Sequence, residues 1–543
     1  MSKKGAIPYG KRLIPPAIDE VARDDPEITC FSIPRTSDLS DGFTDISFRT
    51  FANAINRTAW FIESTIGRSP VFETILYMGA PDIRHYVVLV AAMKTGYKTL
   101  FSSHRNSLAG HIDLIHKTDC KILLHSSAFP VNHILEACKM RPFIIPELEN
   151  IFDEDPVNPY PFQKSWEDAH NDPCLVIHTS GSTGLPKPVI RKHSTLGVPD
   201  AHRLLPTMDG RNLVYTQVFA RAQRIFSGLP IFHGAGLIWG ICHVVFTKKT
   251  VVFGPLSLVN PEIFDQVLQY ANIDGASCIP STLEQISKVP EVVDKLSKLR
   301  HIAYAGGRLA PSAGHIISQK THLINTVAST ETGPLVAYCT DREDWEYVCL
   351  SQVHNGIEFR RTSPTSNLYE LFFVKDPRLD TFQGVFTVFP TLDEYSMNDL
   401  YSPHPTKPHH WRHEGRKDDM IVFANGWNFN PIVHEQLITA HPAVKHAILV
   451  GTGRYKPAAL IELQSSYDAT NEQARQEILE MIWPKICEAN NLADSTGQLD
   501  VNHIVFADPG KPFLIAGKGT VQRKVTIDLY RDEIDLIYDR AGE

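Results

Sequence analysis

The chain has 543 residues, of which 43% are hydrophobic and 21% are charged, and its formal net charge is −8. This length favours about two to four domains, and this composition is that of a globular protein rather than a fibre or a largely disordered chain. The 53 basic and 61 acidic residues are mixed along the chain, so no basic stripe exists to neutralise a phosphate backbone and a nucleic-acid partner is not expected.

The N-terminal segment, MSKKGAIPYGKRLIPPAIDE, carries charge but no apolar core, which argues against a secretory signal peptide. The nine cysteines are scattered, odd in number and never spaced as Cys-x-x-Cys. This pattern indicates reduced thiols rather than a disulfide framework or a zinc site. We therefore expect a cytoplasmic protein.

Strand-like and helix-like patterns alternate between residues 71 and 145. Apolar strands are expected at 71–79, 97–101 and 121–125, with helices at 83–93 and 108–117. Alternating β and α units of this length predict a parallel sheet covered by helices, with ligand sites at the carboxyl ends of the strands. The expected fold class is α/β.

The segment 174–188, CLVIHTSGSTGLPKP, contains an apolar strand that runs into a loop of hydroxyl residues and glycines. Glycines let the main chain approach an anion, hydroxyl and amide groups donate hydrogen bonds to phosphate oxygens, and a lysine adds positive charge. The loop therefore predicts a polyphosphate site. Its candidate nucleotide-binding residues are Thr179, Ser180, Gly181, Ser182, Thr183, Gly184 and Lys187.

A P-loop NTPase also places a glycine-rich loop after a strand, but its signature needs Gly-Lys followed by Ser or Thr. Here Gly184 is followed by Leu-Pro-Lys-Pro. The P-loop interpretation therefore fails.

The segment 229–246 is apolar enough to raise the question of a membrane span. It contains two histidines, one proline and several glycines within a length at the lower limit for crossing a bilayer. Buried protein core is the better interpretation, and no membrane partner is expected.

Composition changes at 402–419, where proline and charge replace hydrophobic periodicity, and this change indicates a domain boundary near its end. Beyond it, strands at 444–450 and 458–463 and a helix at 471–490 suffice for a small α+β domain. The last residues, RDEIDLIYDRAGE, offer no further core, so we expect one module of a longer polypeptide.

Four histidines, His404, His409, His410 and His413, lie in this proline-rich segment. They lie in a proline-rich segment without cysteine partners, so a solvated loop is expected rather than a metal site.

TSGSTGLPKP resembles the signature loop of the adenylate-forming superfamily, which includes acyl-CoA synthetases, adenylation domains and firefly luciferases. Further motifs follow with that family's spacing: AGGRL at 305–309, ASTETG at 328–333, Asn398-Asp399-Leu400, EGRKDD at 414–419, NGWNFNP at 425–431 and GKGTVQR at 517–523. An ordered series of this kind is far more specific than one motif. The resemblance implies an enzyme that uses ATP to convert a carboxylic acid into an acyl-AMP.

The resemblance assigns nucleotide contacts to two of these motifs. Asp399 would accept hydrogen bonds from the ribose hydroxyls, and Arg416 would brace the ribose and phosphates. The walls of the nucleotide site would be formed by Gly306, Gly307, Arg308, Ala328, Ser329 and Thr330, with Gly307 also facing the acid. Val327 stands where the family usually has an aromatic ring, so adenine stacking is expected to be weaker or to come from elsewhere.

Glu331 resembles the family's magnesium ligand. A hard carboxylate beside hydroxyl groups is the kind of donor that Mg²⁺ prefers. ATP and Mg²⁺ are therefore the expected cosubstrate and cofactor.

Lys518 resembles the catalytic lysine of the family. An ammonium at the reacting carboxylate and α-phosphate would neutralise charge that develops in the displacement. Arg523 lies five positions after Lys518, whereas the family more often has an arginine three positions on. Because Lys518 is distant from the phosphate loop in sequence, we expect a large domain over 1–417 and a mobile small domain over 418–543 that delivers it, with Asp418 as the hinge.

His233, in LPIFHGAGL, bears on the choice of acid. Amino-acid-activating domains usually carry an aspartate here, which pairs with the substrate ammonium, and a missing carboxylate would leave that ammonium unpaired. A non-amino acid, for example an aryl acid, is therefore expected. The imidazole of His233 would hydrogen-bond the substrate carboxylate before Lys518 arrives.

The segments 81–107 and 517–526 look like adenylation domains of fungal nonribosomal-peptide-synthetase-like enzymes, including carboxylic acid reductases. The resemblance implies transfer of the acyl group to the phosphopantetheine thiol of a carrier domain, followed by a reductase or thioesterase domain. A free-standing acyl- or aryl-CoA ligase remains an alternative, and a non-catalytic nucleotide-binding module is a further one.

Overall fold

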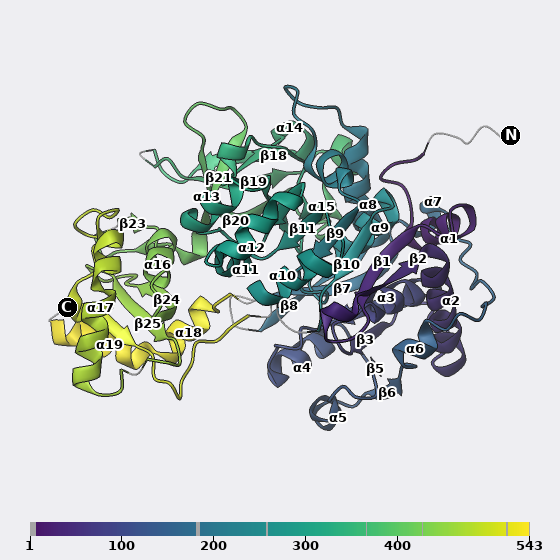
Figure 1. Ribbon diagram of the computed structural model, residues 1–543, viewed down its shortest axis with the longest axis horizontal. Coiled ribbons are helices and arrows are strands. Elements are labelled where there is room, and N and C mark those ends of the chain that lie inside the picture. The colour runs from purple at the N-terminus through teal and green to yellow at the C-terminus, as the bar shows by residue number, and fades with distance from the viewer. Residues whose placement is uncertain are drawn as a thin grey trace.

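The computed structural model describes residues 7–180, 185–256, 259–364, 366–425, 427–467, 469–516 and 520–541. Its strands form two largely parallel sheets, one antiparallel sheet, one three-stranded sheet and two short hairpins. Figure 1 shows the elements from β23 (Asn428–Phe429) to α19 (Arg531–Ala541) gathered at one end of the molecule, with the N-terminus at the opposite end.

The first parallel sheet has the order β6-β5-β3-β4-β7-β8, and only its edge strand β8 runs antiparallel to its neighbour. Its strands are β3 (Thr74–Met78), β4 (Lys98–Phe101), β5 (Ile122–His125), β6 (Arg141–Ile144), β7 (Pro173–Ser180) and β8 (Pro186–Lys192). Because β7 and β8 form a hairpin, the predicted phosphate loop lies at its turn.

The second sheet has the order β13-β12-β11-β9-β10-β1-β2, with only β2 antiparallel to its neighbour. Its strands are β1 (Thr29–Pro34), β2 (Phe43–Ser47), β9 (Arg224–Ser227), β10 (Thr250–Phe253), β11 (Gly275–Cys278), β12 (His301–Tyr304) and β13 (Leu323–Asn325). The α/β class with parallel sheets is therefore confirmed.

Buried helices separate the two parallel sheets. Helix α3 (Arg84–Thr95) contacts the first sheet, α9 (Gly234–Thr247) contacts the second, and the two helices contact each other. Every residue of α3 is buried, which explains why its sequence is apolar on all sides. Gly96 ends the helix with a φ of +85° and an approach to Ser69 that leaves no room for a Cβ.

Helix α9 contains most of the apolar segment 229–246, and its side chains belong to the main hydrophobic cluster. This packing confirms buried core as the reason for the segment's composition. Within the described ranges, no helix combines the length and the apolar character that a bilayer span requires.

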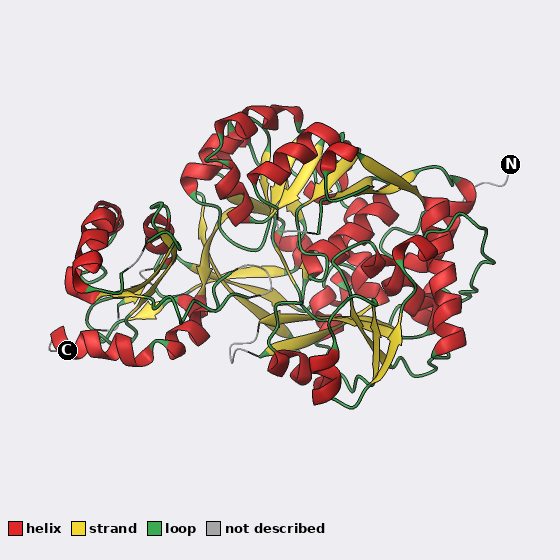
Figure 2. Cartoon of the chain, turned by 60° about the horizontal axis from the view of Figure 1, so that its bottom comes forward, coloured by secondary structure: helices red, strands yellow, loops and turns green. Residues whose placement is uncertain are grey.

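The other helices of the large body surround these sheets (Figure 2). They are α1 (Ile14–Asp24), α2 (Phe48–Thr65), α4 (Leu108–Lys117), α5 (Asn132–Ala137), α6 (Leu148–Ile151), α7 (Trp166–Ala169), α8 (His193–Ala201), α10 (Pro261–Tyr270), α11 (Pro280–Ile286), α12 (Pro290–Lys295), α13 (Pro311–Ser318), α14 (Gln352–Asn355) and α15 (Gly384–Val388).

The antiparallel sheet has the order β16-β17-β21-β20-β19-β18. Its strands are β16 (Ala337–Tyr338), β17 (Tyr347–Leu350), β18 (Ile357–Arg361), β19 (Tyr369–Val374), β20 (Glu394–Pro403) and β21 (His410–Arg416). The segment 402–419, where a solvated loop and a domain boundary near its end are expected, contains the end of β20 and all of β21. Pairing with β17 and β20 orders β21 despite its polar sequence.

The three-stranded sheet consists of β24 (Val444–Val450), β25 (Ala458–Leu463) and β26 (Ile504–Phe506). In β25 the apolar side chains alternate between two hydrophobic clusters: Ala459 and Ile461 face one, and Ala458 and Leu460 face the other. A sheet covered on both faces needs this alternation of two apolar sets. The strands expected at 444–450 and 458–463 are confirmed.

Helices cover both faces of this small sheet. One face packs on α16 (Ile432–Thr439) and α17 (Glu472–Asn490), which confirms the expected helix. The other face packs on residues of α19 (Arg531–Ala541), with α18 (Arg523–Leu529) preceding it. The expectation that the last residues add no core is wrong, because Ile534, Ile537 and Tyr538 are buried there.

Candidate active site

The hairpin β7–β8 presents the predicted phosphate loop. Thr179 on β7 lies opposite Lys187 on β8, next to the turn, and Lys187 is exposed. Residues 181–184, which include the predicted Gly181, Ser182, Thr183 and Gly184, lie outside the described residues. The role of the loop in binding phosphates stays a prediction.

The predicted metal-binding turn is a short hairpin formed by β14 (Ala328–Ser329) and β15 (Gly333–Pro334). Ser329 and Thr332 bond each other twice: the amide of Thr332 donates to Oγ of Ser329 at 3.0 Å, and the amide of Ser329 donates to Oγ1 of Thr332 at 3.3 Å. Glu331 lies between them at the tip and is half-buried.

The residues of this turn fit a divalent cation. A half-buried carboxylate stands beside two hydroxyl groups, and hard oxygen donors of this kind suit Mg²⁺. The role of Glu331 as the Mg²⁺ ligand stays a prediction.

The motif 305–309 follows β12, and Gly306 has a φ of +91°, a conformation that glycine adopts without strain. Arg308 points to the neighbouring sheet, where its Nη1 lies 2.7 Å from Oε2 of Glu414 on β21. Glu414 also accepts hydrogen bonds from Ser402 and Arg412. The guanidinium of Arg308, which the sequence predicts to contact the nucleotide, thus links the motif at 305–309 to the motif at 414–419.

Asp399 and Arg416 are opposite each other on β20 and β21. Oδ1 of Asp399 lies 4.0 Å from Nη1 of Arg416 and 3.6 Å from Nε2 of His413. Arg416 also faces Asp418, with 3.6 Å between Nη2 and Oδ2. Strand pairing therefore brings together the two residues assigned to the ribose.

Tyr395 connects this pair to the metal-binding turn, and the sequence motifs did not indicate it. Burial raises the pKa of the Tyr395 hydroxyl, and the charge of Glu331 adds to this effect. Asp399 acts in the same direction, and Arg416 acts in the opposite direction. The three charged groups therefore lie within electrostatic range of the Tyr395 hydroxyl.

His233 caps the N-terminus of α9, with its Nδ1 accepting a hydrogen bond from the amide of Ala235 at 3.3 Å. An accepting Nδ1 places the proton of the neutral ring on Nε2, which is then a donor. Burial lowers the pKa of His178, the residue before the predicted phosphate loop, to about 4, and a positive charge on His233 would act in the same direction. His233 and His178 are therefore within electrostatic range of each other.

His178 is a second residue that the motif series did not single out. Its Nε2 accepts a hydrogen bond from the amide of Ser103 at 3.0 Å and lies 3.2 Å from Nδ2 of Asn106. The ring thereby attaches the end of β7 to the loop that follows β4.

The predicted hinge lies in the short helical turn Lys417–Asp419. On one side, Nζ of Lys417 lies 2.7 Å from Glu370 on β19. On the other side, Asp419 lies 3.5 Å from Nε of Arg523. Asp418 is thus between one residue tied to the antiparallel sheet and one tied to α18. Lys518 lies outside the described residues, and its catalytic role stays a prediction.

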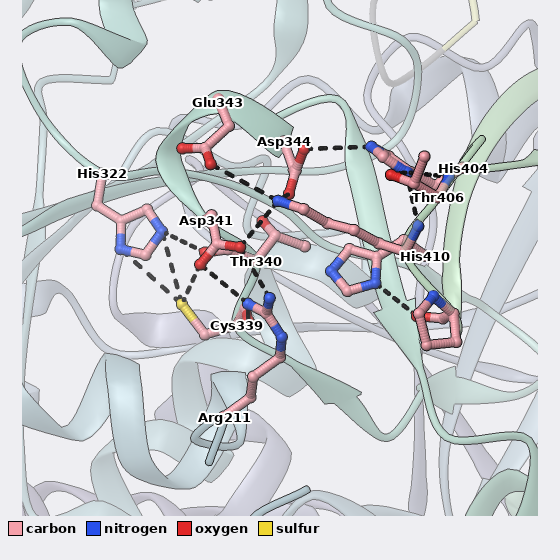
Figure 3. A network of polar contacts seen from close by, with 12 residues as sticks. Arg211, His322, Cys339, Thr340, Asp341, Glu343, Asp344, His404, Thr406 and His410 are labelled. Atoms are coloured by element: carbon pink, nitrogen blue, oxygen red, sulfur yellow. Dashed lines mark hydrogen bonds and ion pairs between the residues drawn. The ribbon is translucent and has the colours of Figure 1, made fainter. Parts of the chain in front are cut away.

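The histidine-rich segment is less solvated than expected. His410 is buried, and Nε2 of His404 lies 3.5 Å from Asp344; of the four, His409 is exposed. Nζ of Lys407 lies 3.0 Å from Oδ2 of Asp341, 3.6 Å from Oε1 of Glu343 and 2.5 Å from Oδ2 of Asp344, and Figure 3 shows these three carboxylates close together. That group is the candidate metal cluster of the described chain, and the lysine ammonium already supplies the positive charge there.

Comparison with known proteins places this geometry in a family. The model of the AMP-binding enzyme family matches residues 18–356, and the model of the AMP-binding enzyme C-terminal domain matches residues 418–542. A carboxylic acid reductase of Neurospora crassa is 35% identical and covers 100% of this chain. An isocyanide synthase–NRPS hybrid of Aspergillus fumigatus is 34% identical over 99% of it, and an adenylate-forming reductase of Serpula lacrymans is 27% identical over 98%.

The chain spans 52%, 34% and 50% of the lengths of these three relatives, so it corresponds to about half or less of each. Solved structures share its fold at low identity. An anthranilate CoA ligase in complex with anthranoyl-AMP has a TM-score of 0.69 at 15% identity, covering 98% of each chain. ATP-bound MatB of Rhodopseudomonas palustris has a TM-score of 0.68 at 14% identity, covering 96% of this chain and 100% of its own.

Proposed function

Because this chain belongs to the AMP-binding enzyme family and is an adenylate-forming enzyme, we propose that it uses MgATP to activate a carboxylic acid without an amino group, such as an aryl acid. The acyl group then passes to a carrier-bound phosphopantetheine thiol. In the first half-reaction a carboxylate oxygen bonds to the α-phosphorus of ATP, and the bond to the departing pyrophosphate breaks. In the second, the thiol sulfur bonds to the acyl carbon, its proton leaves, and AMP departs.

The observation that carries the choice of acid is the place of His233. Its Nδ1 accepts a hydrogen bond from the amide of Ala235, which places the proton of the neutral ring on Nε2. An α-amino acid would need a carboxylate at this position to pair with its ammonium, and a buried unpaired charge is strongly unfavourable. His233 therefore favours an acid without an amino group.

The other residues have separate tasks in this proposal. Thr179, Ser180 and Lys187, with the loop they flank, bind the phosphates, and Asp399 and Arg416 hold the ribose. Glu331 holds Mg²⁺, which when bound supplies positive charge to the departing pyrophosphate. Lys518 donates to the reacting carboxylate and α-phosphate, where negative charge increases in the transition state.

The carrier acceptor and a following reductase or thioesterase domain are supported by the relatives. The matched carboxylic acid reductase and adenylate-forming reductase are about twice as long as this chain. We therefore propose a full-length polypeptide in which a carrier domain and one such catalytic domain complete the reaction sequence.

Pyrophosphate exchange across a panel of aryl, keto, fatty and amino acids tests the first half-reaction. We expect an aryl or other non-amino acid to give the highest exchange rate, and an α-amino acid as the best substrate would contradict the His233 argument. Transfer of the acyl group to a phosphopantetheinylated carrier domain and to free coenzyme A, measured side by side, tests the acceptor. Faster transfer to coenzyme A would identify a CoA ligase instead.

A further inference from the structure

Arg191 is a fully buried arginine on β8, four residues after Lys187. Its relative exposure is 0%. Taking a guanidinium out of water is expensive, and such a group persists only where well-placed hydrogen bonds compensate. A buried arginine would therefore be unexpected if β8 served only to support the predicted phosphate loop.

The guanidinium of Arg191 donates to main-chain carbonyls of the predicted metal-binding turn. Nη1 lies 2.9 Å from the carbonyl oxygen of Glu331 and 3.2 Å from that of Thr330. Nη2 lies 3.2 Å from the carbonyl oxygen of Thr195, in the first turn of α8. One side chain thus joins the strand that leaves the phosphate loop to the residue that would hold Mg²⁺.

The turn is shaped to receive this side chain. Gly333 has a φ of +75°, and a Cβ added there would lie 3.2 Å from Nη2 of Arg191. The left-handed conformation and the close contact both favour glycine. Gly333 therefore lets the turn pass directly over the guanidinium.

The charge of Glu331 also acts on the guanidinium of Arg191. Burial lowers the pKa of Arg191 to about 10, and the charge of Glu331 is one of the influences that counteract the shift. The guanidinium is therefore charged at neutral pH.

We propose that Arg191 is a positioning residue that holds the Thr330–Glu331 main chain in place through these hydrogen bonds and so orients the Glu331 carboxylate for Mg²⁺. Without these hydrogen bonds the tip of the β14–β15 hairpin would lose its connection to β8. The role rests on the proposed function, since it concerns the site for MgATP. Partners that orient a metal ligand typically change metal affinity by about 10–100-fold when removed.

The test compares Arg191→Lys and Arg191→Met with the wild-type chain by calorimetry of ATP binding at a series of Mg²⁺ concentrations. We expect the Mg²⁺ concentration needed for half-maximal ATP binding to rise by about 10-fold or more in Arg191→Met. In Arg191→Lys this Mg²⁺ concentration should rise less, because a lysine restores the positive charge but not the planar set of donors of a guanidinium. Hydrogen exchange of the amides at 328–334 in the ligand-free protein should be faster in both variants.

Lys94→Met is the matched control. Lys94 is also buried and bonds Asp19 and Asn56, which belong to α1 and α2. Its replacement should lower stability without changing the Mg²⁺ dependence or exchange at 328–334. If Arg191→Met does not fold, Gly333→Ala disturbs the same contact from the turn side and should raise the Mg²⁺ requirement in the same way.

The outcomes separate the two proposals. A wild-type chain that binds no ATP with Mg²⁺ would contradict the proposed function. A wild-type chain that binds MgATP, with folded Arg191→Lys and Gly333→Ala variants that keep its Mg²⁺ dependence, would contradict the positioning role alone.

Discussion

Histidine side chains buried in the core determine how this molecule responds to acid. His243 stacks on Trp239, with ring centroids 5.1 Å apart, and neither of its ring nitrogens has a hydrogen-bond partner within the described part of the chain. Burial lowers the pKa of His243 to about 3 and the pKa values of His202 and His301 to about 4. These rings are therefore neutral in the folded protein at neutral pH.

We expect the free energy of unfolding to fall as the pH decreases from about 6.5, the ordinary histidine pKa, toward about 4. In this interval the unfolded chain binds protons that the folded chain does not, so acid favours unfolding. His243→Phe removes one such group and keeps a ring against Trp239, so the stability of this variant should depend less on pH. Urea unfolding at several pH values measures both dependences.

Exposed His116 provides the control, because its ring gains no burial on folding. The pH dependence of His116→Phe should match that of the wild-type protein. Equal pH dependences for His243→Phe and His116→Phe would show that the buried ring does not contribute.

Lys518 is a residue whose replacement should separate binding from chemistry. We expect Lys518→Ala to lower the rate of acyl-adenylate formation by about 10²–10³-fold, because the ammonium acts on charge that develops in the transition state. ATP binding should change little, since the ground state does not need that contact. Pyrophosphate release and ATP calorimetry measure the two quantities, and an unimpaired release rate would remove Lys518 from the mechanism.

At the scale of elements, local sequence patterns predicted the strands and helices whose formation depends on residues close together in the sequence. The strands at 71–79, 97–101 and 121–125 and the helix at 108–117 correspond to β3, β4, β5 and α4, because their apolar periodicity lies within each segment. The strand β21 could not be predicted in this way. Its order comes from pairing with β17 and β20, and its own sequence resembles a linker.

Parts of the candidate site could not be predicted from the sequence, because they depend on contacts between residues that are far apart along the chain. Arg191 lies 139 residues from Thr330 in sequence, so no local pattern shows that their groups meet. Tyr395 is likewise an ordinary strand residue until β20 brings it to Glu331 and Arg416. The motif series could identify Glu331, Asp399 and Arg416, but not the side chains that hold or surround them.

The small C-terminal sheet depends on an ion pair that its strands and helices enclose. The guanidinium of Arg523 on α18 contacts the carboxylate of Glu435 on α16 and donates to the carbonyl oxygen of Leu449 at 2.8 Å. Burial raises the pKa of Glu435, and the charge of Arg523 opposes that rise. The pair therefore connects two helices across β24.

Arg523→Met should destabilise this region by about 3 kcal/mol, because it leaves the Glu435 carboxylate buried and unpaired. Arg531→Met is the matched control, since Arg531 is exposed and contacts Asp528 on the surface. An exposed pair of this kind contributes about 0–1 kcal/mol. Chemical unfolding measures the loss of stability in both variants. Equal losses would show that the Arg523–Glu435 pair contributes no more to stability than the exposed pair.

At the scale of the whole molecule, the C-terminal elements form a body at one end (Figure 1), and the proposed mechanism requires this body to move. Lys518 must reach the carboxylate during adenylation, and a carrier thiol must later approach the same carbon. One closed arrangement cannot serve both steps. A hinge of a few residues absorbs such a change in its main-chain dihedral angles.

The contacts around Asp418 make it the place where this change is expected. Lys417 bonds Glu370 in the antiparallel sheet, and Asp419 faces Arg523 in the C-terminal body. Asp418 lies between them, so rotation about its main-chain bonds would move the two sets of contacts apart without breaking either set. We therefore propose a boundary between a domain over 1–417 and a domain over 418–543.

Asp418→Pro tests this hinge, because proline restricts φ to about −65° and also restricts the residue before it. We expect the variant to keep the half-reaction whose conformation proline tolerates and to lose the other. Asp418→Ala is the control: it removes the carboxylate that faces Arg416 but leaves φ free, so both half-reactions should continue. Adenylate formation and acyl transfer to a carrier are measured separately. Wild-type rates for both steps in Asp418→Pro would place the hinge elsewhere, whereas equal losses in the Pro and Ala variants would assign the effect to the carboxylate.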